Sequence, residues 1–287
     1  MKIFIIGGGG MLGHKLVQSW RDKFEVWTSL RSGIADYEKF NIFDPKKTYE
    51  NINVKNTEQI EEIIGEVKPR VIVNAVGIIK QLPESKDIVN TLEINSIFPH
   101  LLKEIAEKFD SRLINISTDC VFSGSKGNYN EEDVPDAADL YGKSKNLGEV
   151  TGKGCLTLRT SIIGRELLTK HSLAEWFFAS DGGKVKGFKK AVFSGFPTIV
   201  LADILSELIE NHKRLEGLYH LSGGAIDKFS LLNLLKNAYK LNVEIEPDDD
   251  FCIDRSLDST KFRAATGFRP ASWTEMIDLM AKDQTSY

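Results

Sequence analysis

Cysteine is scarce in this sequence of 287 residues, and positive charge is not in excess. The three cysteines, Cys120, Cys155 and Cys252, are odd in number and widely spaced, which argues against a disulfide framework and against a zinc site. A formal net charge of −4 without a concentrated basic stretch argues against a nucleic-acid partner. We therefore expect no metal site and no nucleic-acid ligand, in a protein of the reducing cytoplasm.

Long hydrophobic runs are absent as well. The apolar run at residues 3–6 follows Lys2 but ends in glycine after four residues, which is too short for a signal peptide. No stretch approaches the roughly 20 apolar residues that a membrane-spanning helix needs. With 41% hydrophobic and 27% charged residues, the composition is that of an ordinary globular protein, and we expect no membrane association.

The first 160 residues alternate between short apolar runs and helical patterns. This alternation predicts βαβ units, and the solidly apolar strands predict a parallel sheet buried on both faces. The fold class we expect is α/β, a Rossmann-type doubly wound parallel sheet with a smaller C-terminal substrate-binding lobe. The expected strands are 3–6, 24–30, 50–54, 70–76, 112–118 and 155–160, and the expected helices are 11–20, 57–67, 92–109 and 140–151.

The pattern changes after Ser161. We expect helices at 173–180, 198–212, 229–240 and 273–281, an irregular strand or hairpin at 184–195, one more strand at 217–221, and mainly loops and short elements from Leu241. The division that we expect is a sheet domain of residues 1–160 plus about 198–225, and a smaller lobe of about 161–197 and 226–287.

Four consecutive glycines, residues 7–10, follow the first expected strand. Gly7, Gly10 and Gly13 have the spacing of a dinucleotide-binding turn, in which they allow a tight turn, close approach to a pyrophosphate, and close packing of helix on strand. The phosphates then lie at the helix N-terminus. The alternative is a plain glycine-rich turn. Gly8 and Gly9 have no role in this motif, and we expect His14 to face solvent.

The end of the second expected strand indicates which dinucleotide is bound. An acidic residue there would bind the ribose 2′-hydroxyl of NAD, but the sequence at 28–32 is TSLRS. Arg31 and Ser32 suit a 2′-phosphate, because a guanidinium and a hydroxyl complement a dianion. We expect NADPH, with NADH as the alternative if Arg31 is only a solvated loop residue.

Tyr141 and Lys145 lie four residues apart on an expected helix and therefore share one face. An ammonium beside a phenol stabilises the phenolate, and a phenol so tuned can protonate a carbonyl oxygen while hydride reaches the carbon. Thr118 ends an expected strand, where its hydroxyl would point into the cleft and hold the same oxygen. The alternative is an ordinary exposed helix face.

These features in this order resemble the extended short-chain dehydrogenase/reductase superfamily, and nearly the whole chain resembles the dTDP-4-dehydrorhamnose reductase family. The segments that carry the resemblance are STDCVFSG (117–124), NEE (130–132), YGKSK (141–145), GE (148–149), LRT (158–160), FPT (196–198) and DRSLD (254–258), followed by Lys261.

The resemblance implies reduction of the 4-keto group of a nucleotide-activated 4-keto-6-deoxyhexose by NAD(P)H, in deoxysugar and polysaccharide biosynthesis. It implies Thr118, Tyr141 and Lys145 as the catalytic residues, with Asn95 supporting Lys145. The cofactor-binding residues that we expect are Gly7, Gly10, Met11, Leu12, Gly13, Arg31, Ser32, Asn53, Val54, Asn74, Ala75, Val76, Asn95, Ser117, Tyr141 and Lys145. The substrate-binding residues that we expect are Lys80, Thr118, Asp119, Cys120, Val121, Phe122, Tyr141, His171, Phe193 and Arg255.

Two departures from the family pattern concern the substrate. Cys120 replaces an aromatic residue, and VGIIKQ (76–81) replaces an alanine-rich loop that borders the sugar. Thr118-x-Cys120 with a later His171 also resembles GDP-fucose synthase, whose cysteine and histidine serve in epimerisation. A buried Cys120 and a surface His171 are the favoured interpretation, and a combined epimerase-reductase is the alternative.

Some relatives of the family are regulatory subunits that bind a nucleotide without reducing anything. Degenerate relatives of this kind tend to lose the tyrosine or the lysine, whereas Tyr141 and Lys145 are both present here. We therefore expect an enzyme. Arg255 and Lys261 are candidates for the diphosphate of the substrate, because a dianion needs fixed cations. Dimers are frequent in the superfamily, so the resemblance implies a homodimer, although no sequence feature demands one.

Overall fold

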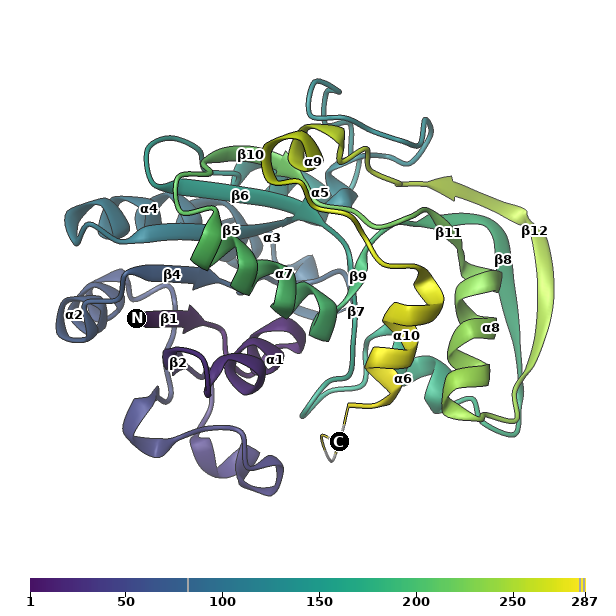
Figure 1. The fold of residues 1–287 in the computed structure, drawn as a ribbon, viewed down its shortest axis with the longest axis horizontal. Helices are drawn as coiled ribbons and strands as arrows, with labels where there is room; N and C mark the ends of the chain where they lie inside the picture. Colours follow the sequence, from purple (N-terminus) through teal and green to yellow (C-terminus); the bar gives the residue numbers. More distant parts are fainter. Residues whose placement is uncertain (82, 284, 286) are drawn as a thin grey trace.

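The computed structural model describes residues 1–81, 83–283, 285 and 287. Its central element is a seven-stranded sheet in the order β10-β6-β5-β4-β1-β2-β3, and every pairing in it is parallel (Figure 1). The order reverses between β1 and β4, so the predicted doubly wound sheet is confirmed. The strands are β1 (Lys2–Ile6), β2 (Glu25–Ser29), β3 (Thr48–Tyr49), β4 (Val71–Asn74), β5 (Arg112–Thr118), β6 (Cys155–Thr160) and β10 (Gly217–His220).

Helices cover both faces of this sheet. Ile3 and Ile5 of β1 belong to one hydrophobic cluster, which includes α1 (Met11–Trp20) and α7 (Thr198–Asn211). Phe4 and Ile6 belong to a second cluster, which includes α2 (Thr57–Val67) and α4 (Phe98–Lys108). Because successive side chains of a strand point to opposite faces, burial on both faces requires the continuous apolar runs seen in the sequence.

The long helix predicted at 92–109 has a more complex form. It begins earlier, as α3 (Ile88–Leu92), passes through a π-helical turn η4 (Glu93–Ile97), and continues as α4. The helix that carries the predicted catalytic pair is α5 (Leu140–Leu147), shorter than the predicted 140–151. The 3₁₀ turns are η1 (Ile34–Phe40), η2 (Pro45–Lys47), η3 (Pro83–Lys86) and η5 (Asp119–Val121).

A second, smaller sheet lies at the opposite end of the molecule from β2 and β3 (Figure 1). Its order is β11-β8-β12, and it packs against α8 (Lys228–Tyr239), which also contacts α10 (Trp273–Ala281). The other elements here are β7 (Ile162–Ile163), α6 (Leu173–Phe178), β8 (Lys184–Phe193), β9 (Phe196–Pro197), β11 (Ile226–Asp227), β12 (Glu244–Asp254) and α9 (Thr260–Thr266).

Two local predictions were wrong. The strand expected at 50–54 is absent, because β3 ends at Tyr49 and the buried Ile52 and Val54 lie outside any strand. Of the strand or hairpin expected at 184–195, the structure has the strand, β8, which pairs with β11 and β12. The loops expected after Leu241 include β12, whose exposed and acidic sequence EIEPDDDFCID lacks the apolar alternation that marks a strand.

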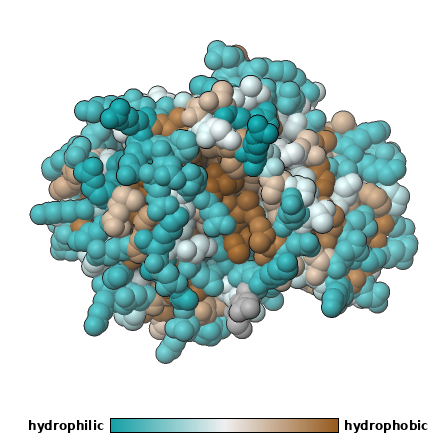
Figure 2. All heavy atoms as spheres, in the orientation of Figure 1, coloured by the Kyte–Doolittle hydropathy of each residue, from teal (hydrophilic) through white to brown (hydrophobic). Residues whose placement is uncertain are grey.

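The surface between the two sheets is hydrophobic and hollowed. Figure 2 shows hydrophobic side chains gathered in a hollow near the middle of this face, over the region between α7 and α10. Among the described residues, no helix is long and apolar enough to cross a membrane.

Candidate active site

The glycine loop between β1 and α1 has the geometry that its spacing predicts. Gly7 adopts φ +90°, a conformation that favours glycine, and so makes the tight turn. A Cβ on Gly13 would lie 2.0 Å from the carbonyl oxygen of Gly7, so only glycine lets the helix approach the strand. A Cβ on Gly10 would meet nothing nearer than the Gly7 oxygen at 3.4 Å. The space beside Gly10 is therefore open to a ligand.

The N-terminus of α1 supplies hydrogen-bond donors to that space. Among the described residues, the backbone N–H groups of Met11, Leu12 and Gly13 have no acceptor, while that of His14 bonds the Gly10 oxygen at 3.1 Å. Free N–H groups at a helix N-terminus, together with the helix dipole, bind phosphate. These residues therefore fit the pyrophosphate of a dinucleotide.

Gly8 and Gly9 are not spare, contrary to the expectation from the motif. A Cβ on Gly8 would lie 2.2 Å from the hydroxyl oxygen of Thr28 in β2. A Cβ on Gly9 would lie 2.3 Å from the hydroxyl oxygen of Tyr37 and 2.9 Å from its ring carbon. Gly7, Gly8 and Gly9 thus let the loop lie close to protein atoms, whereas the space beside Gly10 is open.

The residues predicted to line the rest of the cofactor site are spread over three strand ends. Arg31 is exposed after β2, and Ser32 hydrogen-bonds the Tyr37 hydroxyl at 3.3 Å. Asn53 is exposed, and the side chain of Val54 is buried. After β4, the Asn74 side chain bonds Asn115 and the backbone of Val76, and so fixes the turn formed by Asn74, Ala75 and Val76.

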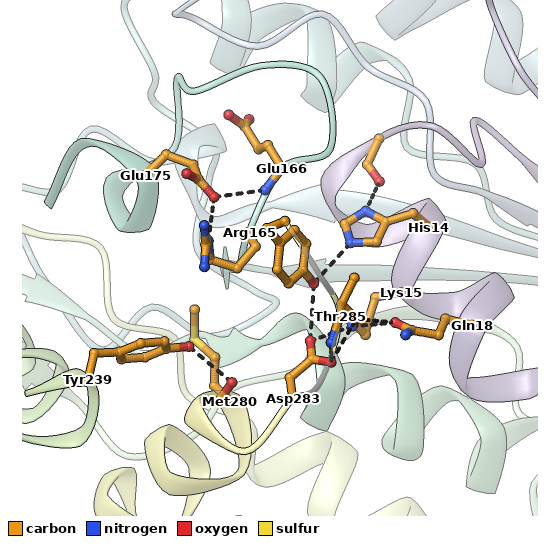
Figure 3. A network of polar contacts seen from close by, with 12 residues as sticks. His14, Lys15, Gln18, Arg165, Glu166, Glu175, Tyr239, Met280, Asp283 and Thr285 are labelled. Atoms are coloured by element: carbon orange, nitrogen blue, oxygen red, sulfur yellow. Dashed lines mark hydrogen bonds and ion pairs between the residues drawn. The ribbon is translucent and has the colours of Figure 1, made fainter. Parts of the chain in front are cut away.

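A paired network holds the helix that carries these donors (Figure 3). The prediction that His14 faces solvent was wrong, because its side chain is fully buried. Its Nδ1 lies 2.8 Å from the Gly10 oxygen. Lys15, only 2% exposed, pairs with Asp283 at 2.5 Å and also bonds Gln18 and Thr285. Burial lowers the pKa of His14 to about 4, so its ring is neutral. The segment after α10 thereby anchors α1.

Tyr141 and Thr118 meet at the carboxyl end of the sheet. Thr118 ends β5; its hydroxyl donates to Asp119 at 3.2 Å, and its side chain interacts with the phenol of Tyr141 on α5. The close approach of α5 requires Gly142, where a Cβ would lie 2.2 Å from the Cys120 carbonyl oxygen. Burial raises the pKa of Tyr141, so the phenol keeps its proton in the absence of a ligand.

Lys145 lies one helical turn from Tyr141 and is buried. Its ammonium donates to the Ile116 carbonyl at 2.8 Å, and burial lowers its pKa to about 8, with Glu149 acting in the opposite direction. Asn95 does not bond Lys145; its amide bonds the neighbouring Ser144 at 3.1 Å and both backbone groups of Ile78. Asn95 therefore holds α5 and the loop after β4 together.

The loop after β4 also approaches Tyr141. Lys80 pairs with Asp139 at 2.6 Å, and its ammonium lies 5.7 Å from the centre of the Tyr141 ring. Asp139 caps α5 through the N–H of Gly142. Cys120 lies near these groups, and burial together with Asp119 raises the pKa of its thiol to about 12. A thiol with so high a pKa stays protonated near neutral pH and offers almost no thiolate to act as a base.

Several predicted substrate residues do not present side chains to this site. Val121 and Phe122 are fully buried and pack with Tyr129 and Leu257. The His171 side chain is exposed, and only its backbone N–H is bonded, to Glu166. Among the described residues, no hydrogen bond or ion pair joins it to Cys120.

Asp119 is buried between two cations from the smaller lobe. Arg255 and Lys228 both interact electrostatically with its carboxyl group. Arg255 follows β12 and was predicted, whereas Lys228 begins α8 and was missed. The sequence did contain one signal for Lys228. It directly follows Asp227, the N-cap of α8, and so lies at the positive end of the helix dipole, where a cation is unfavourable and therefore needs a reason. Lys261, the other predicted cation, bonds the Leu218 carbonyl instead.

Two curated relatives are similar in sequence to nearly the whole of this chain. The dTDP-4-dehydrorhamnose reductase of Aggregatibacter actinomycetemcomitans is 25% identical over 300 residues, which cover 96% of this chain and 97% of that protein. Methionine adenosyltransferase 2 subunit beta of Mus musculus is 24% identical over 315 residues, covering 96% of this chain and 89% of that subunit.

Among solved structures, the dTDP-4-dehydrorhamnose reductase of Bacillus anthracis in complex with NADP superimposes with a TM-score of 0.80 at 20% identity, covering 97% of this chain and 98% of that one. The model of the RmlD substrate binding domain family matches residues 1–286. The chain therefore belongs to the RmlD substrate binding domain family.

Proposed function

We propose that this protein is an NADPH-dependent reductase of the 4-keto group of a nucleotide-activated 4-keto-6-deoxyhexose. The observation that carries the proposal is the junction of Thr118, Tyr141 and Lys145 at the carboxyl edge of the sheet, next to a glycine loop with free N–H donors. This combination provides a phosphate cradle and a proton donor on the same edge.

The chemistry follows from these side chains. The reduced nicotinamide supplies hydride to the sugar carbonyl carbon. Thr118 and Tyr141 hydrogen-bond the carbonyl oxygen, and Tyr141 donates the proton that converts it to a hydroxyl. The Lys145 ammonium stabilises the Tyr141 phenolate that remains after proton transfer. This stabilisation matters because burial raises the pKa of the phenol and so makes its proton harder to give up.

NADPH is the proposed cofactor, with Arg31 and Ser32 beside the 2′-phosphate. The NADP complex of the Bacillus anthracis reductase supports a nicotinamide cofactor. We assign cofactor binding to the sheet domain, residues 1–160 plus about 198–225, and sugar-nucleotide binding to the smaller lobe of about 161–197 and 226–287. The proposed setting is the cytoplasm, in deoxysugar biosynthesis.

A regulatory subunit is the second candidate function. The match to methionine adenosyltransferase 2 subunit beta favours it, because that relative is named as a subunit of another enzyme. The intact Thr118, Tyr141 and Lys145 favour the reductase. The epimerase-reductase alternative is less favoured, because the raised pKa of Cys120 and the exposed position of His171 suit neither residue to proton exchange at a sugar carbon.

The test is NADPH oxidation, followed by absorbance, with dTDP-, UDP- and GDP-linked 4-keto-6-deoxysugars. We expect oxidation with at least one of these sugars, and oxidation slower by about 10²-fold or more with that sugar in Tyr141→Phe. Binding of NADPH without oxidation of it by any sugar would contradict the reductase and favour the regulatory subunit. Deuterium uptake from solvent at C3 or C5 would favour the epimerase.

A further inference from the structure

Two of the sequence segments noted above, GE (148–149) and LRT (158–160), meet in the structure at the end of β5. Glu149 and Arg159 form an ion pair in which both side chains are buried, at 7% and 4% exposure. Arg159 Nε donates to Oε1 of Glu149 at 2.8 Å, and Nη2 donates to Oε2 at 2.7 Å. The hydroxyl of Ser117 donates to the same Oε1 at 2.7 Å. Three hydrogen bonds therefore fix the carboxylate in one position.

The guanidinium of Arg159 is held on its other side as well. Its Nη1 lies 3.1 Å from Nε2 of His220 in β10, and Nδ1 of His220 lies 2.9 Å from the carbonyl oxygen of Tyr129. Burial lowers the pKa of His220 to about 4, so its ring is neutral. Its Nε2 then accepts from Arg159, and its Nδ1 donates to Tyr129. The ion pair is thus the middle of a chain of buried hydrogen bonds.

The end of α5 is an unfavourable place for the Glu149 carboxylate. The helix ends at Leu147, with Gly148 as its C-cap, and the C-terminal end of a helix dipole disfavours an anion. A Cβ on Gly148 would lie 1.9 Å from the Asn95 carbonyl oxygen, so this end of the helix is packed closely against η4. A buried ion pair is in general no more stabilising than apolar residues of the same volume. The pair is better explained by what its carboxylate acts on than by stability.

The group on which Glu149 acts is Lys145. The two residues are four apart in sequence, and they contact consecutive residues of β5: the Lys145 ammonium donates to the Ile116 carbonyl, and the Glu149 carboxylate accepts from Ser117. Among the described residues, Lys145 makes no direct ion pair, so the two charges interact through space, which a protein interior permits over longer distances than water does. Burial lowers the pKa of Lys145, and Glu149 opposes that effect.

Other titratable groups lie around α5, but in the described part of the chain Glu149 is the charged group that acts on the pKa of Lys145. The others are Tyr141 and Lys143 of α5, Lys80 and Asp139, Glu93 of η4, His100 of α4, Asp119 and Cys120 of η5, and Arg159 and His220 beyond Glu149. Without Glu149, burial would be unopposed and Lys145 would lose its proton nearer neutral pH. A neutral amine cannot stabilise the Tyr141 phenolate.

We propose that Glu149 is a positioning residue, whose carboxylate keeps the Lys145 ammonium charged while Tyr141 gives up its proton. Ser117 and Arg159 hold that carboxylate in place. The inference rests on the proposed function, because it assigns a part in the same reaction to a residue that acts through Lys145. The action of Glu149 on Lys145 is measurable without any reaction, so failure of the inference and failure of the proposed function are distinguishable.

The titration of Lys145 itself is the first test, and it needs no substrate. Protein labelled with ¹³C at the Cε of its lysines is titrated and followed by NMR, and the Lys145 signal is identified by its absence in Lys145→Met. We expect a midpoint near pH 8 in the wild type. In Glu149→Gln we expect a midpoint lower by about one pH unit or more, the shift that loss of a nearby opposite charge produces. A wild-type midpoint in folded Glu149→Gln would overturn the inference.

Two further variants separate charge from stability. Glu149→Gln leaves Arg159 buried without its partner, so the double variant Glu149→Gln with Arg159→Met removes both charges. Loss of a cation alone would raise the Lys145 midpoint, so a fall in the double variant comes from the carboxylate. Glu175→Gln breaks the largely buried pair with Arg165 and is the matched control, with an unchanged midpoint expected. No fall in the double variant, or an equal fall in Glu175→Gln, would contradict the proposal.

The pH profile of kcat/KM with the best sugar is the second readout. In Glu149→Gln the alkaline fall should move to lower pH by as much as the Lys145 midpoint does. For a shift of one unit, kcat/KM at pH 8 should drop about fivefold, with little change near pH 6. Glu149→Asp keeps the charge and should return the profile toward that of the wild type.

Two other outcomes are decisive. A loss of kcat/KM that is equal at every pH, with an unmoved Lys145 midpoint, would indicate a structural role and overturn the inference. A lowered Lys145 midpoint in a Glu149→Gln protein whose wild type reduces none of the sugars would uphold the action of Glu149 on Lys145 and contradict only the proposed reaction.

Discussion

Lys15 is buried and Lys228 is half-buried, and their surroundings differ in kind. Lys15, under the cofactor helix, is bonded to Asp283, Gln18 and Thr285 (Figure 3). Lys228, in the site around Tyr141, rests on an aromatic ring and has no hydrogen bond among the described residues. Removal of one member of a buried ion pair leaves the other charge uncompensated and strongly destabilises the fold, whereas Lys228 has no such close partner among the described residues.

The same contrast separates the two halves of the molecule. Among the described residues, the network around α1 pairs its charges and leaves the backbone N–H groups of Met11, Leu12 and Gly13 open, where a phosphate fits. Around Tyr141, the groups with unused donors in the described part of the chain are side chains: the ammonium of Lys145, which bonds one carbonyl, and that of Lys228, which makes no hydrogen bond. The cofactor site is thus built mainly from backbone, and the proposed reaction site mainly from titratable side chains.

Removal of the groups at the reaction site should have the largest effect on activity. We expect Tyr141→Phe and Lys145→Met to lower kcat by about 10²- to 10⁴-fold, the range for loss of a general acid or its support. Steady-state NADPH oxidation with the best sugar measures this effect. Lys143→Met, on the exposed side of the same helix, is the control and should retain full activity.

Removal of a paired lysine should act on stability instead. Lys15→Met leaves Asp283 without its cation, and we expect a loss of about 3–5 kcal/mol in the free energy of unfolding, as for other broken buried pairs. Chemical denaturation measures it, with Lys23→Met as the control, because Lys23 and Glu210 form an exposed pair worth at most about 1 kcal/mol. Equal losses for the two variants would contradict the contrast.

Arg31 tests whether an exposed cation can also be functional. If it binds the 2′-phosphate, Arg31→Ala should raise the Kd for NADPH by about 10- to 100-fold, the effect of a charged hydrogen bond. The Kd for NADH, which lacks that phosphate, should change little, so NADH is the internal control. Fluorescence titration measures both constants. A parallel loss for both cofactors would show that Arg31 does not select between them.

The pH dependence of turnover should be the smallest of these effects. Lys145 has a pKa of about 8 in the folded protein, below its usual value, so it is charged below pH 8 and neutral well above it. Because only the ammonium stabilises the Tyr141 phenolate, kcat/KM should fall to about half of its plateau at that pKa. Calorimetric NADPH binding over the same range is the control, and a flat kcat/KM profile from pH 7 to 9 would contradict this role for Lys145.

Much of the sheet was predictable, because its strands and helices carry local sequence signals. The continuous apolar runs of β1, β5 and β6 and the Asn56 cap of α2 all correspond to the predicted elements. β12 was not predictable, because it is exposed and acidic and depends on β8 for its hydrogen bonds rather than on its own side-chain pattern.

The candidate site divides in the same way. The glycine spacing and the pair Tyr141 and Lys145 are short motifs, so the sequence was sufficient to locate them. The burial of His14 depends on contacts with Tyr287, and the position of Lys228 depends on the docking of α8. Contacts between residues so far apart leave no periodic signal in the sequence.

Transfer of labelled hydride tests the central claim most directly. NADPH that carries two deuterium atoms at C4 of its reduced nicotinamide ring is mixed with the protein and each 4-keto nucleotide sugar, and the product is examined by mass spectrometry and NMR. The account predicts a product heavier by one deuterium, located at C4 of the sugar, which forms about 10²- to 10⁴-fold more slowly with Tyr141→Phe. Tight NADPH binding with no deuterium in any sugar would contradict it.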